Sequence, residues 1–218
     1  MNTELKSYVE REIIPRYDHF DAAHRRDHVE TVIIQSLEIA DRLATRGISL
    51  DRDMVYAIAA YHDTGLCRGR ERHHIDSAEI IRSDAMLKRW FTPEQINVMA
   101  DAAEDHRASA SHEPRTTYGR VVAEADRVID TDTIIRRTLQ YGFDHYPTLG
   151  RDQQLERAEA HLKEKYGYNG YLRLWFDDSP NAERLERLRQ LIDDPDRLRT
   201  AVERIWNSLS PEGSEGSE

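Results

Sequence analysis

Apolar residues recur at steps of three and four positions along most of this chain, a spacing that predicts helices. A first amphipathic helix is expected over Leu5–Ile13, ending before Pro15 because a proline disfavours helical geometry in the residue that precedes it. A longer helix starts at His28, has its apolar positions between Val29 and Leu43, and ends at Gly47. Its first turn directs the His28 side chain inward.

The apolar run Met54–Ala60 predicts another helix, which is capped by Ser49 or Asp51, reaches His62-Asp63 and stops at Gly65. A titratable pair at the edge of a core costs several kcal/mol unless it is paired, hydrogen-bonded or bound to a metal. A His-Asp doublet alone also fits an ordinary helix end. Other ligand-type residues in the chain must therefore decide between the two interpretations.

The rest of the chain continues the helical pattern. A loop over Leu66–Arg72 leads into a helix from about His73 to Trp90, and the capping box Thr92–Gln95 starts a helix that ends near His106. The segment Ala108–Thr116 has turn chemistry and is expected to be a loop. Further helices are expected at residues 118–129, 133–141, 153–166, 181–192 and 196–209. No segment has a convincing strand pattern, so the predicted fold class is all-α.

Composition narrows the kind of protein. The 218 residues are 39% apolar and 33% charged, as expected for a soluble globular protein. No apolar run approaches the roughly 18 residues that span a bilayer, and the N-terminus lacks signal-peptide character, so we expect a cytoplasmic protein without membrane partners. The single Cys67 excludes an internal disulfide and a cysteine-based zinc site, and we expect it to serve packing. The net charge of −10 argues against general nucleic-acid binding.

Several ligand-type residues lie inward or at the ends of different predicted helices. They are His28, His62, Asp63, His73, His106 and Asp126. All-helical proteins build metal sites in this way, from inward side chains on facing helices. The mixture of imidazoles and carboxylates suits Mn, Fe, Co, Ni or Zn better than an all-oxygen Mg or Ca site, and the lack of thiolates argues against a structural zinc.

The order and context of these residues resemble the HD-domain superfamily of metal-dependent phosphohydrolases. The segment from His28 to Val32 matches the His-x-x-x-Val context of the family, His62-Asp63 matches the doublet that names it, and Ala125-Asp126 matches the distal Asp. In the two-metal branch, two more histidines lie between the doublet and the distal Asp. Here His73-His74-Ile75-Asp76-Ser77-Ala78-Glu79 and Glu104-Asp105-His106 match those segments.

The resemblance implies a fold and a ligand set. It implies that His28, His62 and Asp126 hold one divalent ion, that His73 and His106 hold a second, and that Asp63 bridges the two. The fold implied is a helical bundle with its core at about residues 20–130, followed by a helical extension at about 131–210. We expect residues 1–210 to form one domain and 211–218 to be a disordered tail.

The implied activity is hydrolysis of a nucleotide or another small phosphorylated metabolite by a metal-activated water, with Asp63 and His62 at the catalytic centre. The cofactor would be one or two divalent ions, drawn from Mn, Fe, Co, Ni, Zn and Mg. An alternative is an HD-type di-iron oxygenase that cleaves a small polyol or phosphonate, because the same six ligands would serve it. A non-catalytic regulatory module is a third interpretation, weakened because all six ligand positions are intact.

Other residues near the doublet have open roles. His24 is a candidate ligand, a residue beside the site or a solvated residue, and we favour the last two. His74 is an alternative to His73, although only His73 stands four residues before Ser77. Candidates for binding a substrate phosphate are Arg68, Arg70, Arg72 and Arg107, because a guanidinium pairs with two phosphate oxygens, although most arginines in so charged a chain are solvated.

The sequence departs from the family pattern at two places, and these differences narrow the activities that the resemblance implies. Leu66 follows Gly65 where many relatives have a lysine, so any role of that lysine has no bearer here. No Gly-Tyr-Pro follows His106, which argues against a cyclic-di-guanylate phosphodiesterase. The helices after Thr131 are expected to cover the site or to form a homodimer contact. The aromatic residues among them are expected to line a pocket or, as is usual for aromatic residues, to be buried.

Overall fold

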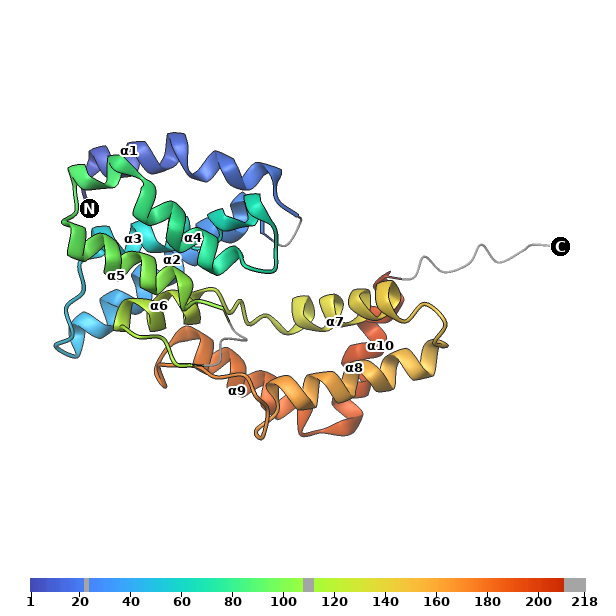
Figure 1. The fold of residues 1–218 in the computed structure, drawn as a ribbon. Coiled ribbons are helices and arrows are strands. Elements are labelled where there is room, and N and C mark those ends of the chain that lie inside the picture. The colour runs from blue at the N-terminus through green and yellow to red at the C-terminus, as the bar shows by residue number, and fades with distance from the viewer. Residues whose placement is uncertain (22–23, 108–111, 210–218) are drawn as a thin grey trace. The chain divides into compact units, whose positions relative to one another are not determined.

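The computed structural model of the chain describes residues 1–21, 24–107 and 112–209, and within these ranges it contains helices and no strand (Figure 1). The predicted all-α fold class is therefore confirmed. The described residues divide into two compact units, Met1–Arg127 and Val128 onward. The prediction that residues 1–210 form one domain stays a prediction, and the tail predicted at 211–218 lies outside the described residues, as does part of the loop predicted at 108–116.

The first unit contains six α-helices and three short 3-10 helices among its described residues. In chain order they are α1 (Thr3–Glu12), η1 (Ile14–His19), α2 (Arg26–Thr45), α3 (Arg52–Tyr61), η2 (Thr64–Arg68), α4 (His73–Ser83), η3 (Ala85–Arg89), α5 (Pro93–Glu104) and α6 (Thr117–Ala125). Helix α2 packs on α3 and α6, and α4 packs on α5 and on η2. None of the described helices in either unit is long and apolar enough to cross a membrane.

Helix α3 is the central helix of the first unit. Every residue from Met54 to Tyr61 is buried, which explains why this segment is apolar on all sides instead of on one face. Helix α1 covers one side of it with Leu5 and Val9, both without exposed surface. The Asp51 side chain caps α3 by accepting from the backbone N–H groups of Asp53 and Met54, so the cap is Asp51 and not Ser49.

The capping box predicted at the start of α5 is also present, with Thr92 and Gln95 bonded reciprocally. By contrast, the helix predicted from His73 to Trp90 is wrong in its second half, because it stops at Ser83 and resumes as the short η3.

The Asp84 carboxylate accounts for this break. One oxygen caps η3 by accepting from the backbone N–H of Met86 (2.9 Å). The other accepts from the hydroxyls of Tyr8 (2.7 Å) and Tyr61 (2.5 Å), which come from α1 and α3. Side-chain hydrogen bonds of this kind compete with helical geometry at the aspartate.

Three smaller expectations also need correction. The helix predicted to reach residue 129 ends at Ala125, with Asp126 as its C-terminal cap. The segment predicted as a loop from Leu66 begins inside η2. Cys67 is exposed, so it does not serve packing.

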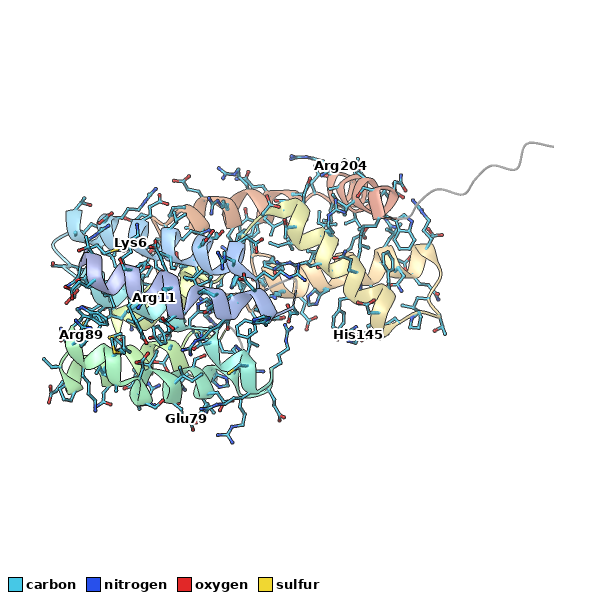
Figure 2. All side chains as sticks on the ribbon, turned by 90° about the horizontal axis from the view of Figure 1, so that it is seen from above. Lys6, Arg11, Glu79, Arg89, His145 and Arg204 are labelled. Atoms are coloured by element: carbon cyan, nitrogen blue, oxygen red, sulfur yellow. The ribbon has the colours of Figure 1, made fainter. Side chains whose placement is uncertain are left out.

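The second unit contains four helices among its described residues, α7 (Thr131–His145), α8 (Arg151–Tyr166), α9 (Pro180–Ile192) and α10 (Pro195–Leu209). Their apolar faces form one core, with Leu139, Leu155, Leu188 and Val202 at its centre. Long charged side chains such as Arg204 cover the outside, as do Lys6 and Arg11 on α1 in the first unit (Figure 2). The expectation that the aromatic residues are mostly buried is wrong for four tyrosines, Tyr141, Tyr146, Tyr168 and Tyr171, which are exposed.

Gly65 provides a test of how closely η2 packs on α4. Its N–H donates to the buried Ser77 hydroxyl (2.9 Å), and a Cβ at this position would overlap the backbone of His73 and Ser77. We expect Gly65→Ala to destabilise the protein by about 2 kcal/mol or more, because neither backbone can give way locally. Thermal unfolding followed by circular dichroism measures the effect.

The matched control is Gly150→Ala, at φ −69°, where an added Cβ would have its nearest neighbouring atom 3.9 Å away, and this variant should change stability by less than about 0.5 kcal/mol. Equal melting temperatures for the Gly65 and Gly150 variants would contradict this packing.

Candidate metal centre

The ends of five helices bring the six predicted ligand residues together in the first unit. His28 lies in the first turn of α2, His62 caps the C-terminus of α3 with Asp63 next to it, His73 begins α4, His106 follows the end of α5, and Asp126 caps the C-terminus of α6. The six residues are spread over positions 28 to 126 of the chain, so only the packing of the bundle makes a single site.

Asp63 lies in the middle of this group and is 2% exposed. Its Oδ2 atom lies 3.3 Å from His62 Nε2 and 3.7 Å from His28 Nε2. Its Oδ1 atom lies 3.4 Å from His73 Nε2 and 3.3 Å from His106 Nε2. Each carboxylate oxygen thus faces a different pair of imidazoles.

The first group of potential ligand atoms comes from His28, His62, Asp63 and Asp126, and these atoms all lie within 4.8 Å of one another. Asp126 Oδ1 is 3.1 Å from His28 Nε2 and 3.6 Å from His62 Nε2. Three nitrogen and oxygen donors around a shared carboxylate oxygen suit a first-row transition-metal ion.

The second group consists of Asp63, His73 and His106. The Nε2 atoms of His73 and His106 are 3.3 Å apart. Whether this contact is favourable depends on which nitrogen of each ring carries the proton. The hydrogen bonds of the Nδ1 atoms determine this.

Backbone carbonyls three residues earlier fix the protonation of three of these rings. Nδ1 of His62 donates to Ala59 O (2.7 Å), and the corresponding bonds run from His106 to Ala103 O (2.5 Å) and from His73 to Arg70 O (2.8 Å). In a neutral imidazole with its proton on Nδ1, Nε2 carries a lone pair. The two facing Nε2 atoms of His73 and His106 therefore repel each other unless a proton or a metal ion lies between them.

The first group also calls for a cation. The buried Nε2 atoms of His28 and His62 have no hydrogen bond of good geometry within the described ranges. Unsatisfied buried nitrogens are costly, and a metal-ligating histidine typically binds through one nitrogen while the other donates to a carbonyl or carboxylate. The residues present therefore fit divalent metal ions at both groups.

Electrostatics of the buried side chains agree with this. Burial disfavours charge on His62, but Asp63 and Asp126 outweigh it and hold the pKa of His62 well above its ordinary value. Burial likewise acts to raise the pKa of both carboxyl groups. The imidazoles of His62 and His106 nevertheless hold the pKa of Asp63 well below its ordinary value. Those of His28 and His62 do the same for the pKa of Asp126. Two ionised carboxylates in a core attract positive charge, which a metal ion would supply.

The site opens to solvent at one edge. The side chains of Asp126, His73 and His28 are 24%, 14% and 12% exposed, whereas those of His62, Asp63 and His106 are almost completely buried. A small molecule that reaches the centre therefore meets Asp126, His73 and His28 first.

Tyr17 supports the centre, and its role was not predicted from the sequence. Its fully buried hydroxyl donates to Ala60 O (2.9 Å) and accepts from the backbone N–H of Asp63 (3.3 Å). Burial, followed by the charge of Asp63, raises the pKa of Tyr17 well above its ordinary value. The contact joins positions 46 residues apart, and no local pattern around Tyr17 indicates it.

An ion pair beside His106 was also missed. Arg115 donates to the buried Asp105 carboxylate from Nε (3.0 Å), Nη2 (2.8 Å) and its backbone N–H (2.7 Å). The pair ties the segment before α6 to the end of α5, and thereby fixes the position of His106. The sequence shows only that Asp105 adjoins His106 in the matched motif. Nothing in it identifies Arg115 as the partner of Asp105.

The alternative ligands lie outside both groups. His24 Nδ1 bonds to Asp21 (2.7 Å), and its ring centre lies 5.8 Å from that of His28, so His24 is a neighbour of the centre. The ring centre of His74 lies 5.5 Å from that of His73, and His74 belongs to neither group.

The four arginine candidates differ in their surroundings. Arg68 pairs with Glu79 (2.8 Å), and the more exposed Arg70 pairs with Asp21 (3.4 Å). Arg107 donates to the Glu71 carbonyl (2.8 Å) and lies near enough to His73 for its charge to add to the effect of burial, which lowers the pKa of His73. For Arg72, the structure shows only that it precedes α4 and is exposed.

In a comparison with protein families, the family model described as HD domain matches residues 25–129. All six residues of the centre lie inside this range. Comparisons with curated proteins and with solved structures gave no match.

Asp63→Asn tests the shared carboxylate. The amide keeps the size of the side chain but loses the charge that both groups share, so we expect metal affinity to fall at least about tenfold and the metal content to drop below that of the wild type. Equilibrium dialysis against Mn²⁺ or Zn²⁺, followed by elemental analysis, measures both.

Asp152→Asn, at an exposed position on α8, is the matched control and should bind metal like the wild type. Unchanged metal content and affinity in the Asp63 variant would show that this carboxylate is not a ligand.

Proposed function

We propose a specific reaction for this chain, which belongs through residues 25–129 to the HD-domain family and so to a superfamily of metal-dependent hydrolases. The reaction is hydrolysis of a phosphate ester or anhydride in a nucleotide or another small phosphorylated metabolite. The observation that carries the proposal is the position of Asp63, with each oxygen facing a separate pair of histidines.

Each residue of the centre has a part in this proposal. His28, His62 and Asp126 would hold one divalent ion, His73 and His106 would hold another, and Asp63 would be shared between them. Bound in pairs, such ions acidify a water and neutralise phosphate oxygens during in-line displacement. The donor set favours Mn, Fe, Co, Ni or Zn, with Mg less suited to so many imidazoles.

The protein itself would orient the reactants. The carbonyls of Ala59, Arg70 and Ala103 hold three imidazoles so that each Nε2 faces the centre, and this alignment needs no rearrangement when a substrate arrives. The substrate would enter past the partly exposed Asp126 and His28. Negative charge on a phosphate would be opposed by the two carboxylates, so bound cations are needed before it can approach.

Arg107 is the best placed of the four arginines to bind a substrate phosphate. Its charge, after the larger effect of burial, helps to lower the pKa of His73, and its guanidinium is held by a hydrogen bond to the Glu71 carbonyl instead of by a carboxylate. Arg68 and Arg70 are engaged with carboxylates on the surface. We therefore assign the phosphate contact to Arg107 in the first place.

A phosphate-release screen tests the proposal. Nucleoside mono-, di- and triphosphates and sugar phosphates are incubated with the protein and with Mn²⁺, Fe²⁺, Co²⁺, Ni²⁺, Mg²⁺ or Zn²⁺ in turn. We expect at least one combination to release phosphate, pyrophosphate or a dephosphorylated product, and chelation or Asp63→Asn to reduce the rate at least about a hundredfold.

Release no faster than with Asp63→Asn in every combination would refute the phosphohydrolase. Oxygen consumption by the iron-loaded protein with a polyol or phosphonate, without phosphate release, would assign the oxygenase chemistry instead.

Substitution of Arg107 separates binding from chemistry. With a substrate found in the screen, we expect Arg107→Gln to raise KM about tenfold and to change kcat less than about threefold, because a guanidinium on a non-reacting phosphate oxygen contributes mainly to binding. Steady-state kinetics over a range of substrate concentrations gives both constants.

Arg120→Gln, an exposed residue on α6 paired with Glu113, is the control and should leave both constants unchanged. A KM for the Arg107 variant equal to that of the wild type would remove Arg107 from the phosphate site.

A further inference from the structure

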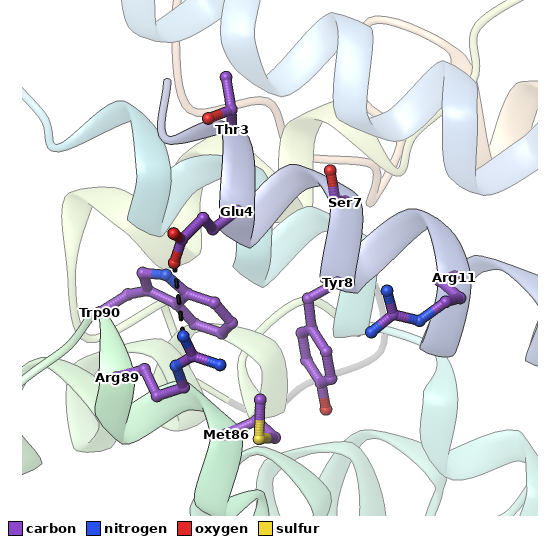
Figure 3. Close-up of a pocket in the computed structure, with 8 residues that line it drawn as sticks. All are labelled: Thr3, Glu4, Ser7, Tyr8, Arg11, Met86, Arg89 and Trp90. Atoms are coloured by element: carbon purple, nitrogen blue, oxygen red, sulfur yellow. Dashed lines mark hydrogen bonds and ion pairs between the residues drawn. The ribbon is translucent and has the colours of Figure 1, made fainter.

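A cavity away from the metal centre lies in the first unit, between α1 and the segment from η3 to Trp90 (Figure 3). Its volume is about 310 Å³, and none of the residues that line it belongs to the metal centre. Ligand sites in proteins range from about 300 to 1,000 Å³, so this cavity suits a small ligand with a single ring system.

One side of the cavity is aromatic. The rings of Tyr8 and Trp90 have their centres 5.5 Å apart and are tilted by 36°, and Met86 lies beside them. Tyr8 is 9% exposed, and its hydroxyl donates to Asp84 (2.7 Å), which fixes the ring. An aromatic wall held in place binds a flat ring without first losing the freedom of mobile side chains.

Positive charge lies on both sides of this wall. Arg11 reaches the cavity from α1, and Arg89 reaches it from the end of η3, where its guanidinium lies 5.5 Å from the centre of the Trp90 ring (Figure 3). The charged lining residues are Glu4, Arg11 and Arg89, which sum to +1 in a chain of net charge −10. The cavity is thus a locally basic place on an acidic protein.

The existing partners of the two arginines are weak competitors. Arg89 meets Glu4 at 3.5 Å, with both side chains more than half exposed, and Arg11 meets the neighbouring Glu12 (2.8 Å) on the surface. Exposed ion pairs contribute little to stability, so a ligand anion can take the place of either carboxylate. The alternative to a ligand site is that the two arginines are simply solvated and bind no ligand. The aromatic wall between them argues against this alternative.

We propose that this cavity is a second ligand site, separate from the metal centre, for a small aromatic anion consisting of one aryl or heteroaryl ring with a phosphonate, phosphate or carboxylate group. The ring stacks on Trp90 beside Tyr8. The anionic group pairs with Arg89 at one side of the aromatic wall or with Arg11 at the other. This inference does not depend on the reaction at the metal centre.

Phenylphosphonate is a suitable probe, because it has one ring and a charged group and cannot be hydrolysed as an ester. Titration calorimetry with the full chain, after chelation of metals, should give saturable binding with a Kd below about 1 mM. Methylphosphonate lacks the ring and benzyl alcohol lacks the charge, and each should bind at least about tenfold more weakly because it keeps only half of the contacts.

Substitutions locate the site. Trp90→Leu and at least one of Arg89→Gln and Arg11→Gln should weaken phenylphosphonate binding about tenfold, and folding is preserved because the two arginines are exposed and Trp90 is only half-buried. Lys88→Gln and Lys6→Gln, on the same two elements but outside the cavity, are the matched controls and should change the Kd less than about twofold. The Asp63→Asn variant should bind the probe like the wild type.

Three results would overturn the proposal. They are the absence of saturable binding, equal affinity in the arginine variants and their lysine controls, and loss of binding in Asp63→Asn, which would place the probe at the metal centre.

Discussion

The Asp63 carboxylate is almost completely removed from water, and a buried anion costs several kcal/mol unless positive charge or hydrogen-bond donors surround it. Four imidazole nitrogens lie within 3.7 Å of its two oxygens, and the N–H of the residue itself is held by Tyr17. The bundle must therefore bring three other helices to one point. Helices α2 and α5 pack on α3, and α4 packs on α5 and on η2, as this requirement demands.

Helix ends solve the problem of orientation. The last carbonyls of a helix lack partners within the helix, and at the end of α3 those of Ala59, Ala60 and Tyr61 accept from His62, Tyr17 and Thr64. The carbonyl of Ala103 serves His106 in the same way at the end of α5. Carbonyl groups that would otherwise need water as a donor thus fix the orientation of the His62 and His106 rings. The same hydrogen bonds give the last carbonyls of these helices a partner.

Local patterns predicted most of the helices and picked out six residues that the structure brings together, and they failed where distant partners act. The caps at Asp51 and Thr92 could be predicted from neighbouring residues, and the candidate ligands from the order of a known motif. The break at Asp84 could not, because it depends on hydroxyls from Tyr8 and Tyr61 in two other helices. The supports from Tyr17 and from Arg115 also join segments whose proximity exists only in the folded unit.

The burial of α1 bears on where this domain begins. The family match starts at residue 25, yet Leu5, Val9, Ile13 and Tyr17 precede it and have no exposed surface. A boundary drawn from sequence similarity therefore cuts through the hydrophobic core, and the matched segment starts later in the chain than the compact unit does. A fragment starting at residue 25 would expose the apolar side of α3 that α1 covers and would leave the Ala60 carbonyl without its tyrosine donor, so the matched segment and the compact unit have different boundaries in this chain.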